Sequence, residues 1–141
     1  MLHTLTMLLF LHGIFLLLLA SLLGIPLGRS MASYKATAEQ KESWRMAHAA
    51  NTGYGVFLMA IAGMFDKILL SSFWLTLIAF SLIIAGYSFL VGTFLAAKLG
   101  YRGLKPKKPF ANLFIYACYI VAVFTSLLGT VILFIGALKS F

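Results

Sequence analysis

The sequence predicts an all-α integral membrane protein, a bundle of four transmembrane helices joined by short loops. Of its 141 residues, 62% are hydrophobic and 10% are charged, and the mean hydropathy is +1.03. Soluble domains carry about a quarter charged residues, so this chain lacks the polar surface that a water-soluble globule needs. Four apolar stretches, at 5–24, 46–65, 73–97 and 110–138, each reach about the 20 residues that cross a bilayer core. The stretches are continuous rather than alternating, which favours helices over a β-barrel.

Helix-breaking residues predict where each helix begins and ends. The whole chain, 1–141, is predicted to form one domain. The first helix, 5–24, is expected to be retained, because "MLHTLT" has no Lys or Arg and no clean cleavage site follows. The motif "GIPLG" is expected to end it, since Pro26 cannot continue a helix. Ser33 is a candidate N-cap for a second helix over 34–65 that begins in the cytoplasm. The break "GYRGLKPKKP" separates helices at 73–97 and 110–138.

The net charge of +8 is concentrated in two loops. The segment 98–109 has five basic residues and no acid, and 28–45 has four basic residues against two acids. Basic loops stay cytoplasmic, so both termini are expected outside, in what we take to be a bacterial inner membrane. This topology signal and contact with lipid headgroups explain the charge without a nucleic-acid partner. The single cysteine, Cys118, forms no internal disulfide.

The stretch "WRMAHAANTGYG", residues 44–55, places polar groups at the entrance of the second span. On a helical wheel His48, Asn51, Thr52 and Gly55 share one face, while Tyr54 lies to the side. Such a stripe faces other helices or a cavity rather than lipid. An ionisable residue in a span is a functional hypothesis, so His48 is a candidate ligand or acid–base group. The alternative is an interfacial histidine hydrogen-bonded near the headgroups, and His12 in the first span has the same two interpretations.

The fourth helix also carries polar residues on one face, among them Tyr116 and Tyr119, and this face is expected to meet the polar face of the second helix. Interhelical hydrogen bonding is the alternative interpretation of these hydroxyls. The third helix has a small-residue stripe that predicts close packing: Ser81, Ala85, Ser88, Gly92 and Ala96. The chain has no zinc-protease HExxH, no phosphate-binding glycine loop and no CxxC.

Two motifs together resemble a known family. "MLH…LHGIFLLLLASLLGIPLG" and "WRMAHAANTGYG" are similar to the small four-helix membrane isomerases, styrene oxide isomerase and its relative hydroxylaminobenzene mutase. The matching residues are the His12-Gly13 pair and Trp44, Ala47 and His48 at the entry to the second helix. "YRGL" and the ending "ALKS" also look like the styrene oxide isomerase pattern.

This resemblance implies haem b held between subunits of a homotrimer, with the residue matching His48 as the axial iron ligand. Ferric iron would act as a Lewis acid on an epoxide, giving an aldehyde by a redox-neutral rearrangement of a small hydrophobic substrate. We expect Trp44 and Arg45 to contact the cofactor. Asn51, Thr52 and Tyr54 are candidates for positioning the substrate, with Tyr116 or Tyr119 closing the pocket from the fourth helix.

The chain departs from the family pattern at two places. Tyr54-Gly55 stand where the family has Asn-Gly after the histidine, and Thr93 falls near the place of a family tyrosine. The substrate therefore stays open, and a rearrangement of the hydroxylaminobenzene mutase type is an alternative. Two further alternatives stay open. One is a non-catalytic haem protein, such as an electron carrier or gas sensor, and the other is a structural or transport protein without a cofactor.

Overall fold

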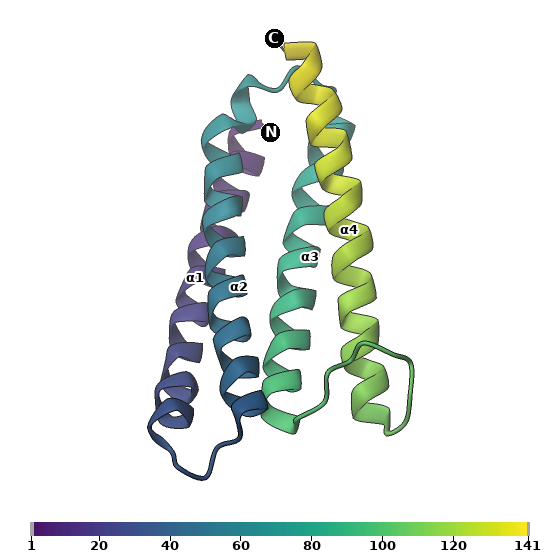
Figure 1. The fold of residues 1–141 in the computed structure, drawn as a ribbon. Coiled ribbons are helices and arrows are strands. Elements are labelled where there is room, and N and C mark those ends of the chain that lie inside the picture. Colours follow the sequence, from purple (N-terminus) through teal and green to yellow (C-terminus); the bar gives the residue numbers. More distant parts are fainter. Residues whose placement is uncertain (1, 141) are drawn as a thin grey trace.

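The computed structural model describes residues 2–140, and these form helices and loops without a strand. The elements are α1 (Leu2–Ala32), α2 (Ala38–Met64), a 3₁₀ turn η1 (Phe65–Lys67), α3 (Ser72–Leu99) and α4 (Phe110–Ser140). The four long helices run up and down alternately, so the basic loops 33–37 and 100–109 lie at the end opposite to the chain termini (Figure 1).

Three of the described helices, α1, α3 and α4, are long and apolar enough to cross a membrane. The expectation of four spans is corrected here, because α2 does not reach this level. The reason is its polar first half, in which a stripe from His48 to Tyr54 follows four charged residues: Glu39, Lys41, Glu42 and Arg45. α2 nevertheless lies beside α1 (Figure 1). The outward orientation of both termini stays a prediction.

The connection between α1 and α2 differs from the sequence-based expectation. α1 continues through Pro26 to Ala32. Proline removes one helical hydrogen bond, whereas ending the helix in an apolar segment would leave several backbone groups without partners. Ser33 does not cap α2, and its hydroxyl instead accepts the Lys35 N–H at 3.2 Å. The N-cap is Thr37, whose hydroxyl accepts the Gln40 N–H at 3.2 Å, so α2 begins at Ala38.

The helices form two pairs, α1 with α2 and α3 with α4, and α3 also contacts α1 and α2. The shared core includes Leu9, Leu16, Leu58, Ile78 and Leu82, which are all fully buried. Of the small stripe of α3, Ser81, Ala85 and Gly92 are buried, and Ser81 and Gly92 lie against α4. The polar faces of α2 and α4 do not form the expected interface in residues 2–140. The bundle is therefore open on the side where these two helices face each other.

Candidate functional site

His48 lies on the face of α2 that packs against α1, where it is half-buried. Its Nδ1 is 2.8 Å from the Ala20 carbonyl oxygen. A carbonyl can only accept, so Nδ1 donates and the neutral ring keeps its lone pair on Nε2. An imidazole oriented by a backbone carbonyl in this way is the arrangement typical of metal-bound histidines. In this tautomer Nε2 of His48 carries the lone pair that ligation of a metal would require.

Trp44 and Arg45, the other expected cofactor contacts, leave α2 in different directions. Trp44 is buried and packs edge-on against Phe94 of α3, with the ring centroids 6.1 Å apart. Arg45 is exposed and pairs with Glu42 at 2.9 Å. Within one chain these two side chains do not surround a common space with His48.

Asn51 is fully buried between α2 and α3, with 1% of its surface exposed. Its Nδ2 donates to the Ala47 carbonyl at 2.6 Å and to Thr93 Oγ1 at 2.8 Å. Its Oδ1 is buried and has no hydrogen-bond partner among residues 2–140. An orphaned buried polar atom costs about 1–3 kcal/mol, so this amide is kept at the expense of stability.

Thr52 and Tyr54 use their hydroxyls within the helix packing. Thr52 Oγ1 donates to the His48 carbonyl at 2.8 Å, inside its own helix. The Tyr54 hydroxyl donates to the Leu82 carbonyl of α3 at 3.0 Å, and its ring covers Gly86. Tyr54 therefore joins α2 to α3.

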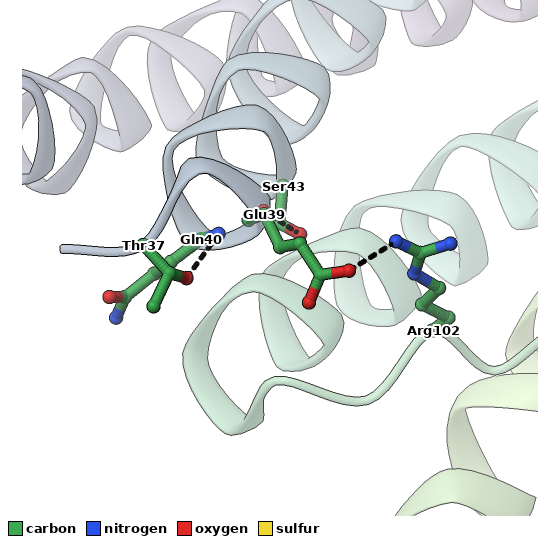
Figure 2. A network of polar contacts seen from close by, with 5 residues as sticks. All are labelled: Thr37, Glu39, Gln40, Ser43 and Arg102. Carbon is green, nitrogen blue, oxygen red and sulfur yellow. Dashed lines mark hydrogen bonds and ion pairs between the residues drawn. The ribbon is translucent and has the colours of Figure 1, made fainter.

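A cleft of about 820 Å³ opens between α2, α3 and α4 near the basic loops, a size typical of small-molecule sites. Thr93 and Tyr119 line it, whereas Tyr116 does not. At the loop end an ion pair joins Arg102 to Glu39 at 2.9 Å, next to the capped start of α2 (Figure 2). The other lining residues are Ala38, Glu42, Ser43, Arg45, Met46, Phe89, Ala96, Tyr101, Leu104 and Val123.

The structure separates the predicted site into two places. His48 faces α1 and does not line the cleft, whereas Arg45 and Tyr119 line it. Thr93 was singled out in the sequence only by its place near a family tyrosine. Its role as the partner of Asn51 depends on the register of α2 against α3, which carries no local signal.

A pair that the sequence reasoning missed joins His12 of α1 to Tyr87 of α3. The distance from His12 Nδ1 to the Tyr87 hydroxyl is 2.7 Å, and the rings meet edge to face at 5.5 Å. An ionisable residue in an apolar helix needs a polar partner, which was the available signal. The identity of that partner follows only from the three-dimensional packing.

The fold is that of a small helical membrane protein, with His12 and His48 hydrogen-bonded inside the helix bundle. Residues 5–138 match the model of the family described as styrene oxide isomerase, and the chain belongs to that family of isomerase-type membrane proteins. Searches of curated proteins and of solved structures gave no significant match.

Proposed function

We propose that this chain is a haem b-dependent membrane isomerase that converts a small hydrophobic epoxide into an aldehyde. The family supports the class of reaction. The hydrogen bond from His48 Nδ1 to the Ala20 carbonyl is the observation that carries the cofactor assignment. It leaves Nε2 as the free donor atom of a neutral imidazole.

The residues present fit a haem better than a bare metal ion. Residues 2–140 contain no group of three or more His, Cys, Asp or Glu side chains that could hold a metal ion. A haem supplies four nitrogen ligands of its own and needs one axial side chain from the protein. His48 supplies one, and a carbonyl fixes its tautomer, whereas the Tyr87 hydroxyl beside His12 Nδ1 can donate or accept and fixes no tautomer there. In this proposal His48 would be the one histidine that holds the haem.

The chain's own residues would orient and protect the reaction. The Ala20 carbonyl fixes the ring plane and the tautomer of His48. When bound, the ferric haem would supply a Lewis acid for the epoxide oxygen. The apolar helix surfaces exclude water, which would otherwise add to the opened epoxide and give a diol. We propose a homotrimer on the strength of the family alone, since lipid can cover the large apolar side chains that the spans α1 and α4 expose.

An absorbance spectrum of the purified protein in detergent tests the cofactor assignment. We expect a Soret band in the wild type and in the His3→Ala control, where the histidine is exposed near the start of α1. His48→Ala should lose the band. A wild-type protein that stays colourless after haem addition, or an unchanged spectrum in His48→Ala, would contradict the proposal.

Two further measurements separate the alternatives. Conversion of styrene oxide into phenylacetaldehyde, followed by gas chromatography, tests the reaction. Because Tyr54 replaces the family asparagine, phenylhydroxylamine is assayed beside it for a mutase-type rearrangement. A low-spin spectrum that resists added ligands, without turnover of either compound, would instead identify an electron carrier.

A further inference from the structure

The loop between α3 and α4, residues 100–109, lies at a membrane surface. Both α3 and α4 are long and apolar enough to cross a bilayer, so the loop that joins them emerges where the two spans end (Figure 1). Of the 11 Lys and Arg residues of the chain, all but Lys67 and Lys139 lie at or near this end of the bundle. The electrostatic potential of this end is therefore strongly positive.

The acidic residues near this end are already held in ion pairs. Glu39 pairs with Arg102 at 2.9 Å (Figure 2). Glu42 pairs with Arg45, also at 2.9 Å. The other cations of the loop, which we call the loop lysines, are exposed and have no acidic partner among residues 2–140: Lys105, Lys107 and Lys108. Neighbouring ammonium groups without a counter-ion attract an anion.

One side chain of α4 holds the main chain of the loop in a defined shape. Asn112, near the start of α4, accepts the Gly103 N–H through its Oδ1 at 3.1 Å. Its Nδ2 donates to the carbonyl oxygens of Lys105 and Lys107, at 2.9 Å each. The Lys107 N–H also donates to the Lys105 carbonyl at 2.8 Å. The main chain that carries the loop lysines is thus fixed before a ligand arrives, which reduces the entropy lost on binding.

Two large apolar side chains flank the loop lysines and indicate which anion fits. Leu104 and Phe110 are 70% and 78% exposed. At a bilayer surface such side chains enter the acyl layer while lysine ammonium groups stay at the level of the phosphates. A soluble anion or a nucleic acid would leave both apolar side chains in water. A topology signal needs charge alone, and it explains neither these side chains nor the hydrogen bonds of Asn112.

We propose that the α3–α4 loop is a binding site for anionic phospholipids, in which the loop lysines contact the phosphate and Leu104 and Phe110 enter the acyl layer. Asn112 is a positioning residue that presents the loop lysines to the headgroup. The site contains neither His48 nor His12, so the proposal goes beyond the haem chemistry and does not depend on it.

Two lipids with the same acyl chains test the proposal: dioleoylphosphatidylglycerol, which is anionic, and dioleoylphosphatidylcholine, which has no net charge. Binding of each to the full-length protein in detergent is measured by native mass spectrometry, which separates lipid-bound from lipid-free protein by mass. The result is readable with or without haem. We expect the wild type to bind phosphatidylglycerol about ten-fold more tightly than phosphatidylcholine.

Charge changes locate the preference for phosphatidylglycerol. Lys105→Gln, Lys107→Gln and Lys108→Gln together should abolish it, whereas the three corresponding changes to arginine keep the charge and should retain it. Lys67→Gln with Lys139→Gln is the matched control, because these cations lie at the opposite end of the bundle. This control should leave the preference unchanged.

Asn112→Ala tests the positioning role, because it keeps every charge and frees the loop. We expect the preference for phosphatidylglycerol to fall about three-fold while the affinity for phosphatidylcholine stays at the wild-type value. A general loss of structure would instead change the affinities for both lipids. An unchanged preference in this variant would overturn the role of Asn112.

Other results would overturn the lipid site itself. These are equal affinities of the wild type for the two lipids, a preference that survives the three glutamine changes, and an equal loss in the control at the opposite end. Ammonium phosphate is added in a last experiment. Displacement of phosphatidylglycerol by millimolar phosphate would show that the loop binds any phosphate anion, and it would contradict the assignment to a lipid.

Discussion

Gly13 of α1 and Gly55 of α2 meet backbone to backbone. A Cβ atom at Gly55 would lie 2.9 Å from the Gly13 carbonyl oxygen and 2.9 Å from the Leu17 nitrogen. Small residues allow membrane helices to approach this closely. The contact sets the spacing of the α1–α2 pair and, further along it, allows the Ala20 carbonyl to reach His48.

Gly55→Ala is expected to lower the stability of the protein by about 1–3 kcal/mol, because its methyl group would meet rigid backbone. Gly53 is the matched control on the same helix, since a Cβ atom there meets nothing within 4 Å. Gly53→Ala should be neutral or stabilising by about 0.5–1 kcal/mol, through the better helix propensity of alanine. Thermal unfolding in detergent, followed by circular dichroism, measures both. Equal losses in the two variants would argue against the backbone contact.

The sequence located the helices best where apolar runs end in clear breakers. α3 and α4 begin and end within two residues of the expected 73–97 and 110–138. The predicted end of α1 near Gly24 was wrong. Pro26 removes one helical hydrogen bond, but ending the helix there would leave more backbone groups unpaired in an apolar segment. The status of α2 as a span was overestimated, since the polar residues that mark its inner face also reduce its hydropathy.

The polar stripe predicted which face of α2 turns inward but not what each residue meets. Asn51 finds Thr93, 42 residues away, and this pairing depends on the relative register of two helices. His48 finds a main-chain carbonyl, for which a sequence contains no specific signal. α2 and α4 do not pack closely as expected, because α4 packs mainly on α3 and a cleft lies between α2, α3 and α4.

Tyr87→Phe is expected to destabilise the protein by about 0.6 kcal/mol, the average contribution of a hydrogen bond between membrane helices. The change removes only the hydroxyl that lies 2.7 Å from His12 Nδ1 and keeps the packing of the ring. Tyr34→Phe is the control, because Tyr34 is fully exposed in the first loop. Chemical unfolding in mixed micelles resolves the difference. If Tyr34→Phe has the same effect as Tyr87→Phe, the His12 contact contributes nothing.

Arg102→Gln is expected to change stability by less than about 0.5 kcal/mol, despite the short ion pair with Glu39 (Figure 2). The two side chains are 71% and 79% exposed, so water and salt screen their attraction. Thr37→Ala, which removes the N-cap in the same network, should cost more, about 1 kcal/mol. The same unfolding assay compares the two, and a larger effect of Arg102→Gln would show that the ion pair is protected from solvent.

Removing both members of the Asn51–Thr93 pair should be milder than the sum of the single changes. Thr93→Val leaves a buried amide hydrogen of Asn51 without an acceptor, which costs about 1–3 kcal/mol. When Asn51 is already leucine, Thr93→Val leaves no amide hydrogen without an acceptor. Asn51→Leu also removes the Oδ1 that has no partner among the described residues. A double-mutant cycle on the unfolding free energy should therefore give a coupling of about 1 kcal/mol between the two positions. Additive effects would mean that the amide hydrogen finds another acceptor when Thr93 is replaced.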